Sequence, residues 1–168
     1  LDEPGVELVG VEAGGLGIAS GQHAARMVAG CGSSPGVAQG YKTRFLQTAE
    51  GQMQDTHSIA AGLDYVGASP ILADLGDRGR ARSEPATDRE VIEALSLARR
   101  TEGLIPAMES AHAFVQAFKE APQMRPDQAI IINMSGRGDK DIFTIAHAFD
   151  DPSWKAFIVG RAKNYSAH

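Results

Sequence analysis

The sequence predicts an α/β fold in which a short parallel sheet carries helices on its faces. Residues 6–11 and 128–132 are runs of β-branched and apolar residues, which are typical of buried strands in a parallel sheet. Between these runs lie two stretches with apolar residues at helical spacing. The chain has 168 residues, of which 43% are hydrophobic, so it is long enough to bury one core.

The first predicted strand, residues 6–11, is followed by a long irregular segment. Residues 13–53 are rich in glycine and small side chains and show no lasting periodicity. A loop of this length in a compact domain usually forms a site or packs against another part of the protein. After it, we expect a helix at residues 56–63 and a charged surface connection at residues 77–86, which contains glycine and proline.

Two helices are predicted in the middle of the chain. Thr87 and Glu90 have the spacing of a capping box, which begins a helix that Gly103 ends. A second helix is predicted at residues 108–120, where apolar residues recur on one face. These residues are Ala111, Phe114, Val115 and Phe118.

The second predicted strand, residues 128–132, leads directly into a glycine-containing turn at residues 135–141, and a helix is predicted at residues 142–149. A strand, a glycine turn and a helix in this order can bind a phosphate or another ligand at the carboxyl end of the strand. A plain tight turn explains the same residues equally well. The tail, residues 150–168, contains Trp154 and is predicted to form one more short helix.

Composition disfavours several classes of function. The formal net charge of −5 would repel nucleic acid, and no apolar run reaches the ~18–20 residues of a membrane span. Cys31 is the only cysteine, which fits a reducing compartment, so we expect a cytoplasmic protein without membrane or nucleic-acid partners. The chain begins with Leu1 instead of methionine, and we expect it to be part of a longer polypeptide.

Two carboxylates are candidates for chemistry, each with a plainer explanation. Glu109 lies in the first turn of a predicted helix, where the helix dipole favours a carboxylate by about 0.3–1 kcal/mol. Asp64 precedes an irregular run and is equally explained as a turn residue. His112 follows Glu109 by three residues, but the pair lacks the third ligand that a metal site needs. The motifs of hydrolases and nucleotide-binding proteins are not found.

Five segments resemble, in order, the β chain of tryptophan synthase. Residues 10–15, 46–52, 58–65, 102–113 and 133–141 read GVEAGG, LQTAEGQ, SIAAGLDY, EGLIPAMESAHA and NMSGRGDKD. Only the tail after about Phe149 lies outside the resemblance. The resemblance implies a partial three-layer sandwich of the fold type II pyridoxal-phosphate (PLP) enzymes. Residues 1–149 would be the C-terminal portion of the PLP domain, and residues 150–168 a C-terminal helical tail.

The resemblance also implies an activity and its partners. The expected enzyme is a PLP-dependent lyase of tryptophan biosynthesis that joins L-serine and indole to give L-tryptophan. It would work beside an α chain, which makes the indole from indole-3-glycerol phosphate, and beside a second β chain. Ser135 would hydrogen-bond the pyridine nitrogen of PLP, with Gly136 also at the cofactor. A neutral hydroxyl there leaves the ring nitrogen largely unprotonated, which suits β-elimination and replacement.

The remaining site residues also follow from the resemblance. Glu109 would lie near the cofactor ring and the indole, where a carboxylate can assist the departure of the serine hydroxyl and stabilise charge on the indole nitrogen. Asp64 would hold the serine-derived substrate when the site closes. The carbonyl groups of Leu63, Tyr65 and Gly67 would bind a monovalent cation, although the residue after Tyr65 is valine where the family normally has proline.

The sequence also departs from the family. The lysine that forms the Schiff base, the loop that holds the cofactor phosphate and the domain that meets the α chain lie upstream in the family. We therefore expect an upstream half of the same polypeptide to supply them, and this chain alone to be inactive. One alternative is a non-catalytic remnant or partner-binding module. Another is a different fold type II enzyme, such as a cysteine synthase or a serine/threonine dehydratase, which the AGLD and PAMES stretches disfavour.

Overall fold

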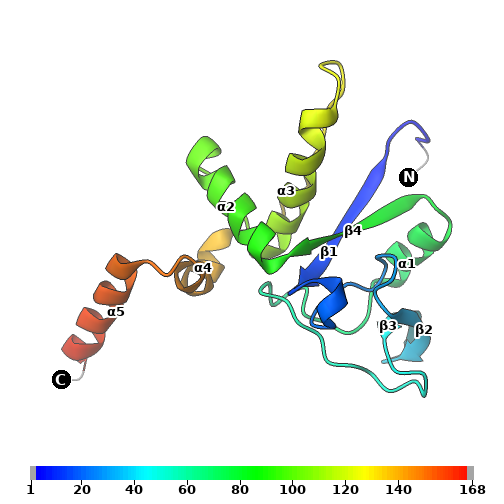
Figure 1. Ribbon diagram of the computed structural model, residues 1–168, viewed down its shortest axis with the longest axis horizontal. Helices are drawn as coiled ribbons and strands as arrows, with labels where there is room; N and C mark the ends of the chain where they lie inside the picture. The colour runs from blue at the N-terminus through cyan, green and yellow to red at the C-terminus, as the bar shows by residue number, and fades with distance from the viewer. Residues whose placement is uncertain (1–2, 166–168) are drawn as a thin grey trace.

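The structure is a computed structural model, and it describes residues 3–165. At its centre β1 (Leu8–Gly15) and β4 (Ala81–Thr87) form a two-stranded parallel sheet. Helices α2 (Asp88–Glu102) and α3 (Met108–Glu120) pack together and against this sheet, whereas α1 (Pro70–Asp77) contacts β4 and the hairpin (Figure 1). The predicted class, α/β with a short parallel sheet and flanking helices, is confirmed.

The helical region, residues 87–120, forms as the sequence predicts. The hydroxyl of Thr87 accepts the N–H of Glu90 at 3.3 Å, and the Glu90 carboxylate accepts the N–H of Thr87 at 2.8 Å, so the capping box is complete. Helix α2 ends before Gly103, and α3 spans the predicted residues. The buried core joins these two helices to the sheet. Its members include Ala86, Val91, Ala94, Leu95, Ala98, Met108, Ala111, Phe114, Val115 and Ile145.

The strand β4 replaces the surface connection that we expected at residues 77–86, so that prediction is wrong. Its charged side chains belong to ion pairs at the surface of the sheet. Arg82 pairs with Glu84 of the same strand at 2.9 Å, and it also pairs with Glu7 before β1 and Glu120 at the end of α3. These pairs let a charged sequence form a strand, which a count of apolar residues cannot reveal.

The expected strand at residues 128–132 is also absent: this segment of the structure has no strand. Ile131 is 95% exposed, and only Ile132 packs, in part, against the core. A strand needs a neighbouring strand for its backbone hydrogen bonds, and hydrophobic composition alone does not supply one. The first strand is shifted as well, since β1 begins at Leu8 and continues to Gly15.

Part of the irregular segment forms a β-hairpin that the sequence analysis did not predict. Strands β2 (Ser33–Ala38) and β3 (Tyr41–Leu46) are antiparallel, and Gln39 and Gly40 between them have φ values of 53° and 85°. Two positive φ values in a two-residue loop are the pattern of a type I′ hairpin turn.

The helix expected at residues 56–63 does not form. The ring of His57 contacts the carboxylate of Asp88 at 2.8 Å, and the N–H of Ile59 donates to the same carboxylate at 3.1 Å. These contacts hold the backbone against the start of α2, and only a single turn closes at Ala60, where Leu63 and Asp64 donate to its carbonyl oxygen.

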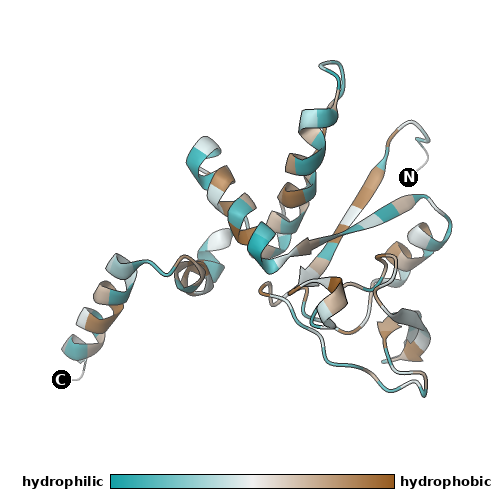
Figure 2. Cartoon of the chain, in the orientation of Figure 1, coloured by the Kyte–Doolittle hydropathy of each residue, from teal (hydrophilic) through white to brown (hydrophobic). Residues whose placement is uncertain are grey.

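The last part of the chain contains a short 3-10 helix (Gly138–Asp141), α4 (Ile142–Ala148) and α5 (Pro152–Tyr165). Figure 1 shows α5 extending away from the sheet, and Figure 2 shows hydrophobic residues on α4 and α5. Phe143, Phe157 and Val159 are exposed there. The helices of the tail are as predicted, whereas a domain division at residue 149 stays a prediction. Among residues 3–165, no helix has both the length and the hydrophobicity that crossing a membrane requires.

Candidate functional site

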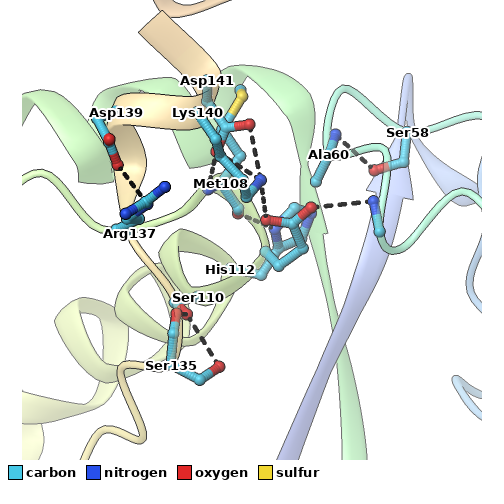
Figure 3. A network of polar contacts seen from close by, with 12 residues as sticks. Ser58, Ala60, Met108, Ser110, His112, Ser135, Arg137, Asp139, Lys140 and Asp141 are labelled. Carbon is cyan, nitrogen blue, oxygen red and sulfur yellow. Dashed lines mark hydrogen bonds and ion pairs between the residues drawn. The ribbon is translucent and has the colours of Figure 1, made fainter.

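The first turn of α3 is fixed to the turn at residues 135–141. Ala107 has no polar side chain to cap the helix, and the carboxylate of Asp141 accepts the N–H of Met108 at 3.0 Å instead. The hydroxyl of Ser110 donates to the carbonyl oxygen of Ser135 at 2.6 Å. Figure 3 shows both contacts, with Asp141 beside Met108 and Ser110 beside Ser135. The structure therefore brings two of the segments that carry predicted site residues into direct contact.

The Glu109 carboxylate connects a third segment, the loop at Gly62, to the contact between α3 and the turn at residues 135–141. Its Oε1 accepts the N–H of Gly62 at 2.9 Å, and its Oε2 accepts from the ammonium group of Lys140 at 2.8 Å. A Cβ atom on residue 62 would lie 2.7 Å from Oε1 of Glu109, so a larger residue there would displace the carboxylate from this position. Lys140 also donates to both oxygens of Asp141, at 2.7 and 2.9 Å.

These contacts keep Glu109 ionised. Partial burial alone would raise the pKa of Glu109, but hydrogen bonds from Lys140, from its own N–H and from Gly62 outweigh burial and lower the pKa below its ordinary value. Burial likewise opposes the charge on Lys140, and the carboxylates of Asp141 and Glu109 outweigh it and raise the pKa of Lys140. Glu109 and Lys140 therefore form an ion pair at neutral pH, and the side chain of Lys140 is 45% exposed.

The turn at Ser135 and Gly136 lies at the surface, beside Ser110 of α3. Ser135 is exposed, and its hydroxyl lies 3.5 Å from that of Ser110. Gly136 has a φ of 73°. Gly138 is buried and donates its N–H to the carbonyl oxygen of Ile105 at 3.0 Å, which seats the turn directly on the residues that precede α3.

The predicted site residue Asp64 is exposed and lies two residues after Gly62, in the turn that begins at Ala60. The Gly62–Glu109 contact therefore anchors the loop that carries Asp64 to the start of α3. Glu109 is connected to Asp64 through the hydrogen bond to Gly62 in the same loop. It is connected to Ser135 through Ser110 of α3 and through Lys140 of the turn at residues 135–141.

His112 is a buried structural residue. It is 0% exposed, and its Nδ1 hydrogen-bonds the carbonyl oxygen of Met108 at 2.8 Å, so Nδ1 carries the proton. Burial is the main cause of its lowered pKa. Within residues 3–165, no group of three or more histidine, cysteine, aspartate and glutamate side chains could hold a metal ion.

The carbonyl groups predicted to bind a cation face an arginine. The guanidinium Nη1 of Arg26 donates to the carbonyl oxygen of Leu63 at 3.5 Å and also to that of Tyr65. Gly67 lies in the same loop, and its backbone pairs with Phe45 of β3. Two of the three predicted ligands are thus hydrogen-bonded to a side chain of the protein itself.

Sequence reasoning missed Lys140 and Arg26 as partners of the predicted site residues. Lys140 lies in the turn at residues 135–141, and its contacts with Glu109 and Asp141 bring that turn to the start of α3. Arg26 lies in a segment without periodicity, and it interacts with Glu12, which directly follows the first apolar run. The one signal in the sequence was Glu12 itself, because a carboxylate that directly follows a predicted buried strand needs a positively charged or hydrogen-bonding partner.

Relatives of the chain were found by comparing it with known proteins, among them two tryptophan synthase beta chains. No protein-family model matches the chain. A tryptophan synthase beta chain from Helicobacter hepaticus is 49% identical over 158 residues, which is 94% of this chain and 37% of the relative. A tryptophan synthase beta chain from Methylibium petroleiphilum is 55% identical over 142 residues, 84% of this chain and 34% of the relative. The chain therefore spans about a third of the length of these curated relatives.

The fold places the chain among α/β proteins with helices on a short parallel sheet. Within that class, the chain belongs to the family of tryptophan synthase β chains and corresponds to their C-terminal part. The match also extends further than we expected. A match confined to residues 1–149 could not cover 158 residues, so it reaches into the tail after Phe149.

Proposed function

We propose that this chain is the C-terminal part of a PLP-dependent enzyme that joins L-serine and indole to give L-tryptophan. The lysine that holds the cofactor would come from an earlier part of the same polypeptide. The observation that carries the proposal is the Glu109 carboxylate, which Gly62 and Lys140 hold at the start of α3 beside the loop that carries Asp64. The two relatives named tryptophan synthase beta chain support the same assignment.

The chemistry of the Ser135 turn fits PLP. A hydroxyl can donate a hydrogen bond to a ring nitrogen without protonating it, and the exposed Ser135 offers such a group. The contact from Ser110 to the Ser135 carbonyl oxygen holds the backbone, and Gly136 adds no side chain beside the hydroxyl. Ser135 and Gly136 would hold the cofactor, which supplies an electron sink for the α carbon of the substrate.

Glu109 would act as a carboxylate. Its lowered pKa keeps it ionised at neutral pH, so it can accept the N–H of indole and stabilise positive charge that develops there as the new carbon–carbon bond forms. Lys140 and Gly62 fix the orientation of this carboxylate. Asp64, on the loop next to it, would hold the substrate by a hydrogen bond when the site closes.

The surface of the chain supports the proposal that more of the polypeptide packs against it. β1 and β4 form a parallel sheet of two strands, and parallel sheets are normally covered on both faces. Exposed apolar side chains such as Leu16, Ile71 and Ile131 fit a surface that another segment covers. An upstream half, a second β chain and an α chain are the partners we propose, in the cytoplasm.

The test uses the full polypeptide that contains this chain, with PLP, L-serine and indole, and follows tryptophan formation. Glu109→Gln should lower kcat by about 100–1000-fold, because it removes a charge that stabilises the transition state. Glu93→Gln is the matched control, since Glu93 is an exposed carboxylate on α2 whose side chain is 65% accessible. Its rate should equal that of the wild type.

The absorbance spectrum of bound PLP and the far-UV circular dichroism of both variants should match the wild type. A wild-type protein that binds PLP but makes no tryptophan would overturn the proposed function and favour a non-catalytic module. A Glu109→Gln variant with the wild-type rate would remove Glu109 from the site while leaving the activity in place.

A further inference from the structure

Arg26 is a buried arginine whose charge points toward a loop of the candidate site. The residue is 8% exposed, and it lies in the irregular segment between β1 and β2. Its Nη1 donates to the carbonyl oxygens of Leu63 and Tyr65, which flank Asp64 in the sequence. A guanidinium group is charged at every physiological pH, so a permanent positive charge lies against this loop.

The other side of the guanidinium faces a buried carboxylate. Glu12, at 4% exposure, has its Oε1 3.6 Å from Nε of Arg26. The same carboxylate accepts the backbone N–H of Arg26 at 3.0 Å and those of Met27 and Val28 at 2.7 and 2.9 Å. A buried charge needs partners of opposite charge or polarity, and the guanidinium has the Glu12 carboxylate on one side and the carbonyl oxygens of Leu63 and Tyr65 on the other. Its buried Nε faces Glu12 as an ion pair and makes no hydrogen bond.

The arrangement has the features of a cation site. Two carbonyl oxygens of one loop and a carboxylate oxygen surround one positive group, and oxygen atoms of these kinds are the ligands that hard cations take. The monovalent cation that the resemblance implies would need the carbonyl groups of Leu63 and Tyr65, which already bind the guanidinium. A second cation beside Arg26 would also meet its repulsion. These residues therefore do not fit a free monovalent cation.

We propose that the guanidinium of Arg26 is a built-in cation that takes the place of a monovalent metal ion in this protein. It ties the Asp64 loop to Glu12 of β1, and Glu109 holds the same loop through Gly62. Arginine suits this role better than lysine, because its planar fork lets Nη1 bind carbonyl oxygens while Nε faces Glu12. The protein should then need no added monovalent cation.

The test compares the full polypeptide in tetramethylammonium chloride with the same protein in NaCl, KCl or CsCl at equal ionic strength. Two quantities are measured, the unfolding temperature and the rate of tryptophan formation. The wild type should show the same values in every salt. Arg26→Ala should lose activity by about 10–100-fold in tetramethylammonium chloride, because the Asp64 loop shifts, and should regain most of it in KCl or with guanidinium ion.

Arg78→Ala is the matched control, since Arg78 is 73% exposed and pairs with Asp74 at the surface. It should show no response that is specific to one cation. If Arg26→Ala fails to fold in all salts, Arg26→Gln, which keeps a long polar side chain without the charge, takes its place: a higher unfolding temperature in KCl than in tetramethylammonium chloride supports the proposal, and equal values in every salt overturn it.

Two results overturn the proposal directly. One is a wild type that KCl activates or stabilises, since that requires a cation besides Arg26. The other is an Arg26→Ala variant that equals the wild type in both measurements. The activity measurement rests on the proposed function, whereas the unfolding temperature does not. A wild type that makes no tryptophan in any salt would thus overturn the proposed function and leave the role of Arg26 to the unfolding temperature.

Discussion

The helical region, residues 87–120, and the loop region, residues 12–67, are held together by different forces. In the helical region, buried apolar side chains such as Leu95 and Met108 fill the space between α2 and α3. In the loop region, polar and charged groups, among them Glu12, His23 and Arg26, are buried beside apolar ones such as Phe45. Apolar contact dominates the packing of the first region, whereas hydrogen bonds from buried polar side chains to the backbone contribute more to the second.

This difference has a consequence for substitutions. Apolar packing is shared among many neighbours, so a smaller side chain in the helical region leaves a cavity whose cost grows with its volume. A buried carboxylate with three N–H donors has no substitute, so its loss leaves all three donors and a charge without a partner. We expect single polar residues in the loop region to matter as much as the largest apolar residues of the helices.

The largest effect is expected for Glu12→Ala. The change leaves the Arg26 guanidinium buried without its carboxylate, and breaking a buried pair in this way costs about 3–5 kcal/mol of folding free energy. Unfolding of the full polypeptide in urea measures it, and hydrogen exchange should rise first at residues 26–28. Glu7→Ala is the control, because Glu7 precedes the same strand, is 67% exposed and pairs with Arg82 at the surface. A Glu12→Ala variant as stable as Glu7→Ala would show that the buried polar contacts of the loop region do not stabilise the fold.

The next effect is expected for Leu95→Ala in the helical region. Leu95 is 0% exposed, and removing a buried leucine side chain costs about 2–5 kcal/mol, depending on how far the neighbours relax. Hydrogen exchange should rise in both α2 and α3, because they share the cavity. Leu97 is 39% exposed on the same helix, so Leu97→Ala should be close to neutral. Faster exchange in the loop region after Leu95→Ala would show that the two regions unfold together.

The sequence predicted the helical region because its signals are local and periodic. The capping box at Thr87 and the apolar stripe on α3 each act within a few residues of the chain, and both formed where they were expected. The strand β4 was missed because its charges are paired with Glu7 and Glu120, which are far away in the sequence. The run at residues 128–132 was mistaken for a strand because pairing depends on a neighbour, and composition does not report one.

The candidate site was predicted only in part, because its motifs are local in the sequence and the partners of its residues are not. Motifs identified Glu109, Asp64 and Ser135 as candidates, and the structure connects their segments through α3 and the loop at Gly62. Lys140 and Arg26 act across 31 and 37 residues of sequence on Glu109 and Leu63. No rule of spacing relates such distant positions, so the partners that hold the site could not be found from one sequence.

A smaller effect concerns pH, since each region contains one buried histidine. Burial is the main cause that lowers the pKa of both His112 and His23 from 6.5. The unfolded chain therefore binds protons below about pH 6.5 that the folded chain does not bind, so stability falls as pH falls from there toward the lowered pKa. The slope for one histidine is at most about 1.4 kcal/mol per pH unit.

Urea unfolding between neutral and mildly acidic pH measures this slope for the wild type, His112→Gln and His23→Gln. Each glutamine variant should have a shallower slope than the wild type, because it removes one group that titrates only on unfolding. His112, at 0% exposure against 4% for His23, should account for the larger share. A wild type whose stability does not change over this range would mean that neither region keeps its histidine neutral by burial.

The smallest effect is expected for Thr87→Ala, at the point where the two regions meet. Thr87 caps α2, and the next residue, Asp88, holds His57 and Ile59 of the loop region. Loss of a capping side chain costs about 1 kcal/mol. Thr101→Ala is the control, because Thr101 lies in the last turn of α2 and only donates to the carbonyl oxygen of Leu97. If hydrogen exchange rises in the first turn of α2 alone, the regions are independent at their junction; an equal rise at residues 57–59 would mean that the cap also holds the loop.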